Sequence, residues 1–180
     1  MKTAIRAVIL LLIVLWLGGV MFFPIVAASA FGSLPDVHAA GTVVAKCLRV
    51  LHYEGFFAGA IIVILLLIGQ AIRAFPRSVL VPVILALIML GLTSYSQFSV
   101  IPRMDHDIAA TGGDISSVPA NNPYRMDFNR LHHWSEHLEE GVLVAGIILV
   151  ILLAANYPKI SPESETKAAD SHPLSESAGS

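Results

Sequence analysis

Apolar residues in this chain gather in four long runs that polar segments separate. The runs cover residues 7–35, 55–72, 79–98 and 141–156, and the first has no ionisable side chain before Asp36. At about 1.5 Å per residue, a run of about 18 to 20 residues is roughly 27–30 Å long, which is the thickness of a hydrocarbon core. The pattern therefore predicts four membrane-spanning helices.

Turn residues and helical spacing set the expected limits of these helices. The predicted fold is an all-α, integral membrane four-helix bundle, with helices at about 5–32, 42–73, 78–103 and 127–157. The residues that follow are Ser, Glu, Ala and Pro without an apolar period, so we expect a disordered tail over 158–180. We expect one four-helix domain over 1–157 and no soluble domain.

The beginning of the chain allows a second interpretation. Residues 1–6 are basic, and residues 28–30, Ala-Ser-Ala, resemble a signal-peptide cleavage site. The apolar stretch before that site is about 20 residues long, however, and a signal h-region has roughly 7–15. We therefore expect the first helix to be retained.

Composition agrees with a membrane protein and excludes several other classes. Hydrophobic residues make up 56% of the chain and charged residues 13%, with a mean hydropathy of +0.74. The net charge is −2 and basic residues are scattered, so no nucleic-acid partner is expected. Cys47 is the only cysteine, which excludes an internal disulfide and a CxxC redox motif.

The expected orientation rests on basic residues in short loops. The turn 71–78 carries Arg73 and Arg77 and no acidic residue, whereas the opposite side carries several aspartates. Because short basic loops stay in the cytoplasm, we expect both termini to be cytoplasmic. The expected location is the inner (plasma) membrane of a bacterium.

The segment 128–140 concentrates the residues that could carry chemistry. Helical spacing places His132, Ser135 and Glu139 on one stripe, which we expect inside the bundle. Ionisable groups near hydrocarbon usually face the bundle interior and mark ligand or proton sites. The residues expected to form such a site at the mouth of the bundle are His52, Arg103, Asp105, Arg130, His132, Ser135 and Glu139.

Two other interpretations of the polar residues remain open. Interhelical hydrogen bonds of His132 and Ser135 could be purely structural. His133, His137 and Glu140 form a second stripe at the aqueous rim, and the i, i+4 histidines have metal-compatible spacing. A metal site there would need further ligands.

Three stretches resemble a known family. They are 15–24 (LWLGGVMFFP), 95–105 (which contains VIPRMD), and 128–132 (FNRLH) followed by Ser135. Together they resemble the transmembrane protein 205-like family, four-helix membrane proteins of unknown function. The resemblance implies a four-helix fold over roughly 7–155 and no established chemistry, and the family often has Asn where this chain has Glu139.

The predicted function is therefore a small polytopic integral membrane protein of unknown biochemical role, with the lipid bilayer as its environment. No catalytic motif favours an enzyme, and no cofactor is predicted. One alternative is a haem- or metal-binding redox protein with His52 and His132 as the best axial ligands. The other is a small transporter-like oligomer, and a second copy or another membrane protein is the expected kind of partner.

Overall fold

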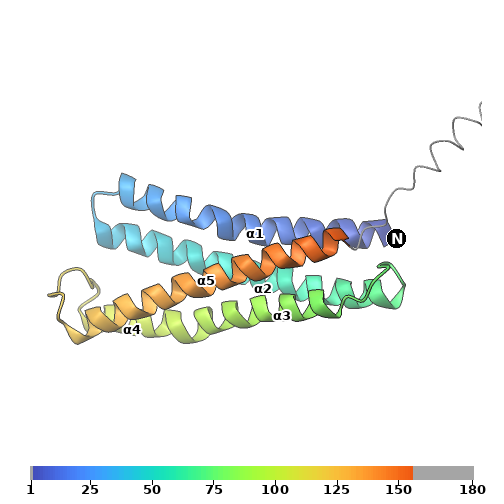
Figure 1. Ribbon diagram of the computed structural model, residues 1–180. Coiled ribbons are helices and arrows are strands. Elements are labelled where there is room, and N and C mark those ends of the chain that lie inside the picture. Colours follow the sequence, from blue (N-terminus) through green and yellow to red (C-terminus); the bar gives the residue numbers. More distant parts are fainter. Residues whose placement is uncertain (1, 156–180) are drawn as a thin grey trace, which may run out of the picture.

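The computed structural model describes residues 2–155 and consists of helices within that part of the chain. Four helical segments are long and apolar enough to cross a membrane, and the third of them, Leu80–Ala110, is made of three consecutive elements (Figure 1). The elements are α1 (Lys2–Ser33), α2 (Val37–Ala71), α3 (Leu80–Tyr95), the π-helix η1 (Ser96–Val100), α4 (Ile101–Ala110) and α5 (Pro123–Ala155). The predicted all-α membrane bundle is confirmed, and the tail predicted over 158–180 lies outside the described residues.

Three of the helices extend further than hydropathy indicates. α2 begins at Val37 because Asp36 caps it, accepting hydrogen bonds from the backbone N–H groups of His38 (3.0 Å) and Ala39 (3.3 Å). α5 begins at Pro123, a residue suited to a first helical position. α3, η1 and α4 form one span, Leu80–Ala110. Charged residues end a hydrophobic run, but they do not break backbone hydrogen bonding.

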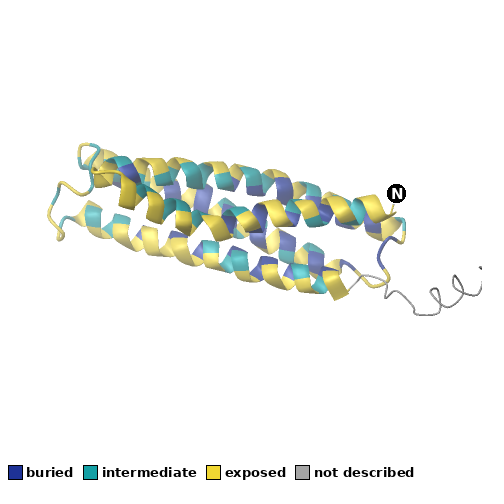
Figure 2. Ribbon diagram, turned by 90° about the horizontal axis from the view of Figure 1, so that it is seen from above, coloured by how far each residue is buried: buried dark blue, intermediate teal, exposed yellow. Residues whose placement is uncertain are grey.

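The helices pack so that each buries one narrow stripe. α1 lies against α2, α2 against α3, and α3 against α5, which closes on α1. Figure 2 shows buried residues along the inside of the bundle and exposed residues along its outside. The centre holds Trp16, Ile62, Leu66, Met89 and Leu149.

Glycines on α2 make room for the largest of these side chains. A Cβ at Gly55 would lie 2.5 Å from Trp16 Nε1, and one at Gly59 would lie 2.7 Å from Trp16 Cζ3. Small residues allow such close approach between membrane helices. The Trp16 indole therefore fixes how α1 sits on α2.

The bundle is longer than a membrane is thick. The 35 residues of α2 are about 52 Å long at 1.5 Å per residue, against a hydrocarbon core of about 30 Å. Tyr53, Tyr95 and Trp134 are exposed on three different helices, as expected of an aromatic belt at a membrane–water interface. Gly19 of α1 lies against Leu51 of α2, so the end of α1 also lies beyond this belt, in a part that we call the extension, made of residues 20–51 and 101–133.

Candidate functional site

Three helices bring together a buried chain of polar side chains. His52 of α2 is 1% exposed. Its Nδ1 lies 2.9 Å from Gln97 Oε1 on η1, and its Nε2 lies 2.7 Å from Glu139 Oε1 on α5. We call these three residues the His52 triad. It lies next to the aromatic belt, where the extension meets the membrane-embedded part.

The π-helix that carries Gln97 has a local cause. Pro102 follows it and cannot donate a hydrogen bond to the carbonyl of Phe98, and its ring crowds that carbonyl. A wider turn before the proline relieves the crowding. Single π-turns of this kind occur frequently at functional sites.

More polar atoms lie around the triad. Thr93 and Ser96, one turn or less before Gln97, are buried, and their hydroxyl oxygens have no hydrogen-bond partner among the described residues. The same holds for Oε1 of Glu54, whose other oxygen lies over Gly19 of α1. Ser135 is also buried, one turn before Glu139. The triad thus sits in a polar layer between apolar regions.

The two hydrogen bonds of His52 are compatible with two protonation states of the triad. When His52 Nδ1–H donates to Gln97 Oε1, the Nε2 atom and Glu139 share one further proton. Rotation of the Gln97 amide by 180° would instead present its N–H to Nδ1, and Nε2–H would then donate to the Glu139 carboxylate. Both arrangements satisfy the imidazole, and they differ by one proton. The triad can therefore hold or release a proton without leaving a ring nitrogen unpaired.

His132 does not join this layer, and its expected place inside the bundle is wrong. Its side chain is 53% exposed, with Nε2 3.4 Å from Glu136 Oε1, and its ring stacks on Phe128. Leu131 takes the buried position on that turn of α5. Burying leucine is favourable and burying an unpartnered imidazole is costly, so the stripe turns toward Leu131.

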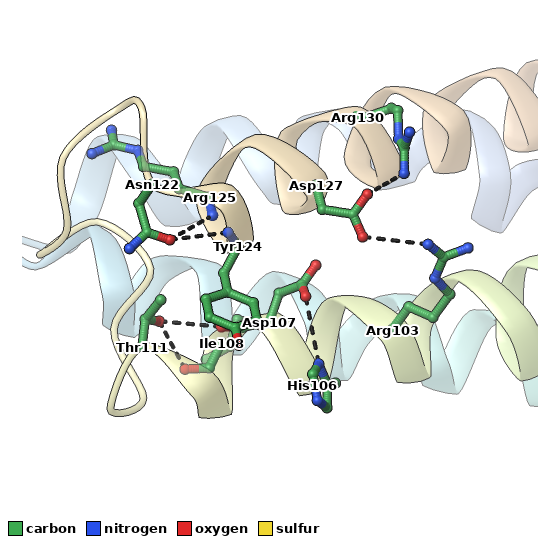
Figure 3. A network of polar contacts seen from close by, with 10 residues as sticks. All are labelled: Arg103, His106, Asp107, Ile108, Thr111, Asn122, Tyr124, Arg125, Asp127 and Arg130. Carbon is green, nitrogen blue, oxygen red and sulfur yellow. Dashed lines mark hydrogen bonds and ion pairs between the residues drawn. The ribbon is translucent and has the colours of Figure 1, made fainter.

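Arg103 and Arg130, which we expected in the same site as Glu139, pair elsewhere. Arg103 and Arg130 both bind Asp127, the former at 3.4 Å (Figure 3). Asp105 pairs with Arg49 at 2.5 Å. These pairs lie in the extension, where Arg130 and Asp127 are one turn apart on α5 and the other two pairs join neighbouring helices.

Three residues of these networks escaped prediction from the sequence. Gln97 is the one side chain with an amide in the run 79–101, and Thr93 precedes it by one turn, so an isolated amide on a polar stripe was the available signal. Arg49 and Asp127 offered no such signal, because exposed charges pair according to tertiary proximity.

The histidines expected at the rim form exposed pairs with glutamates. His133 Nδ1 lies 3.0 Å from Glu136 Oε2, and His137 Nδ1 lies 3.1 Å from Glu140 Oε2. In residues 2–155, no three His, Cys, Asp or Glu side chains are gathered closely enough to hold a metal ion. The predicted set His133, His137 and Glu140 is therefore not brought together as a ligand sphere.

The two histidines expected as candidates for an axial haem ligand differ in their surroundings. Such a histidine offers one ring nitrogen to the iron, but both nitrogens of His52 are engaged by Gln97 and Glu139. His132 is on an exposed face of the extension.

An open cavity runs along α4 and the beginning of α5 and reaches Phe98 and Ser99 of η1. Its volume is about 680 Å³, and its lining includes Arg103, His106, Asp107, Tyr124 and Asp127. Asp107 is buried, with Oδ1 3.6 Å from His106 Nδ1 (Figure 3). The guanidinium of Arg103 is paired with Asp127. The polar side chains that line the cavity therefore do not form a buried hydrogen-bonded set comparable to the triad.

Comparison with known proteins gives one match. The model of a family described as "Domain of unknown function (DUF4149)" matches residues 11–106, which is 96 of the 180 residues. The matched segment contains His52 and Gln97 but ends before Glu139. No curated protein and no solved structure matches the chain.

Proposed function

Because the chain belongs to the DUF4149 family, which has no described function, we propose a role from its own geometry. It is an integral membrane protein that binds and releases a proton at His52 and Glu139, and the proton changes how α2, η1 and α5 are held together. One observation carries the proposal, namely the 2.7 Å contact between His52 Nε2 and Glu139 Oε1.

The surroundings of this contact support a proton site rather than an inert bond. Ionisable residues inside membrane bundles are costly and commonly serve proton relays. Rotation of the Gln97 amide lets both protonation states keep a full set of hydrogen bonds to His52. The buried hydroxyls of Thr93 and Ser96 and the Glu54 carboxylate supply additional sites for ordered water beside the triad.

The proton exchanges with one side of the membrane only. Thr93 lies one turn, about 6 Å, deeper than Gln97 along α3. Beyond Thr93 the buried side chains of all four spans are apolar, among them Met89, Leu66 and Leu149. The Glu139 side chain is 15% exposed, and apolar packing beyond Thr93 separates the triad from the opposite surface, which favours a proton-responsive protein over a proton channel or transporter.

The finer assignments belong to the same proposal. The resemblance to the transmembrane protein 205-like family, the bacterial inner membrane and the cytoplasmic termini stay predictions. The purely basic turn 71–78 supports this orientation, which places the triad near the non-cytoplasmic surface.

Infrared difference spectroscopy on the full-length protein in lipid vesicles tests the proposal. A change of external pH should produce a carboxyl band that disappears in Glu139→Gln and changes in His52→Gln. Glu136→Gln is the matched control, because Glu136 also contacts histidines but its side chain is exposed, and it should keep the band. A band that persists in Glu139→Gln would refute the assignment, and so would proton conductance across the vesicle.

A further inference from the structure

The end of the bundle opposite the extension carries basic side chains without acidic ones. They are Lys2, Arg6, Arg73 and Arg77, and residues 2–10, 68–82 and 148–155 contain no Asp or Glu. In the extension, by contrast, Arg49, Arg103 and Arg130 all pair with aspartates. Within these described ranges, this end of the bundle is thus basic.

The turn between α2 and α3 forms a cavity that Arg6 and Arg73 line. Its volume is about 480 Å³, and the lining residues are Arg6, Gln70, Arg73, Ala74, Phe75 and Pro76. Arg73 has φ 54°, the left-handed region that residues other than glycine seldom adopt. The Ala74 N–H donates to the Gly69 carbonyl (2.7 Å), which holds the chain in this conformation.

Helix α1 fixes one wall of the cavity. The Arg6 guanidinium donates to the Ala74 carbonyl and lies 5.6 Å from the centre of the buried Phe75 ring. Arg6 therefore ties α1 to the turn, Arg73 is the other cation that lines the cavity, and Arg77 follows directly after the last lining residue.

The cavity lies at the second membrane surface. From Tyr95 of the aromatic belt to Leu80, where α3 begins, is 15 residues, or about 22 Å at helical rise, and Arg77 lies three residues further along the chain. The turn therefore lies near the opposite headgroups of a bilayer whose hydrocarbon core is about 30 Å thick. Ile68, Leu80 and Val81 are exposed near the turn, where acyl chains would contact them.

We propose that this cavity binds the phosphate headgroup of an anionic phospholipid. Guanidinium groups match phosphate oxygens in charge and in geometry, and basic pockets between membrane helices bind such headgroups. Free phosphate shares this chemistry, but the exposed apolar residues beside the turn favour a lipid. The inference is independent of the proton site at the other surface.

Native mass spectrometry of the full-length protein in a neutral detergent tests this site, with phosphatidylglycerol and phosphatidylcholine as probes. Wild type should bind phosphatidylglycerol more tightly than phosphatidylcholine. Arg73→Gln should weaken phosphatidylglycerol binding about fivefold, and adding Arg77→Gln should weaken it by roughly the same factor again. Binding of phosphatidylcholine should stay unchanged.

The matched control is Arg103→Gln, which removes the same charge from the extension and should leave phosphatidylglycerol binding unchanged. Equal losses in this control and in Arg73→Gln would overturn the site, because net charge alone would then explain the effect. Displacement of phosphatidylglycerol by millimolar inorganic phosphate would overturn the lipid assignment. An unchanged unfolding temperature of the variants in phosphatidylcholine shows that the fold is intact.

Discussion

His52 and His132 each follow a leucine on a membrane-directed helix, yet they have opposite environments. His52 is enclosed and hydrogen-bonded through both ring nitrogens, whereas His132 is half-exposed beside Glu136. The difference comes from the partners on neighbouring helices. An imidazole can be buried only where acceptors or donors for both nitrogens are already in place.

Replacing each histidine by alanine should separate the two environments. His52→Ala leaves Gln97 and Glu139 without their partner, and we expect a loss of about 1–3 kcal/mol in the free energy of unfolding. His132→Ala removes only an exposed contact and should stay within about 0.5 kcal/mol of wild type. Denaturant titration in mixed micelles measures both values. Equal effects would contradict the placement of His52 in a buried network.

At the scale of the helices, two local features hold the triad in position. The π-helix Ser96–Val100 presents Gln97 toward α2 and α5 just before Pro102. Trp16 packs into the surface left by Gly55, three residues after His52. Glycine is required at position 55 because the Trp16 indole lies too close for a Cβ, and not because of the backbone conformation.

A methyl group at this contact should be costly. A Cβ in Gly55→Ala would lie 2.5 Å and 2.8 Å from two atoms of the rigid Trp16 indole, and we expect a loss of about 1–3 kcal/mol from overpacking. Gly18→Ala on α1 is the control, because nothing lies within 4 Å of its Cβ. That change should stabilise the helix by up to about 1 kcal/mol. Thermal unfolding of both variants distinguishes packing from helix propensity, and a stable Gly55→Ala protein would argue against the observed contact.

As a whole, the molecule is a bundle of which one part lies in lipid and another projects from it. The aromatic belt of Tyr53, Tyr95 and Trp134 and the basic turn 71–78 mark the two surfaces, about one hydrocarbon thickness apart. The salt bridges of the extension lie beyond the belt, where water can solvate them. The two surfaces differ in charge, which gives the protein a defined orientation.

Labelling of single cysteines in intact cells should reveal this arrangement. In a Cys47→Ser background, we expect a membrane-impermeant maleimide to label His133→Cys from outside the cytoplasmic membrane. It should label Arg77→Cys only after the cells are opened. Ile148→Cys, exposed on the apolar face of α5, should stay unlabelled because it faces lipid. Labelling of Arg77→Cys in intact cells would reverse the proposed orientation.

Hydrophobic pattern alone was sufficient to predict the class of fold. Each span must satisfy its backbone internally and present apolar side chains to lipid, so its signature is local and can be read from consecutive residues. The same pattern made three helices too short, with the second and fourth beginning too late and the third ending too early, because charged residues leave the hydrocarbon without ending helical hydrogen bonding. His52 and Glu139 could be assigned to one polar cluster from the sequence because both are ionisable residues next to apolar runs.

Only the tertiary structure decided which partners these residues meet. Gln97 meets His52 across 45 residues of sequence, and Glu139 meets His52 across 87. Leu131 takes the interior position that we expected for His132. The rotation of each helix about its axis depends on the packing of whole faces, such as Trp16 against Gly55. Sequence periodicity defines a stripe to within about one residue, or 100° of rotation, and that uncertainty separates a buried histidine from an exposed one.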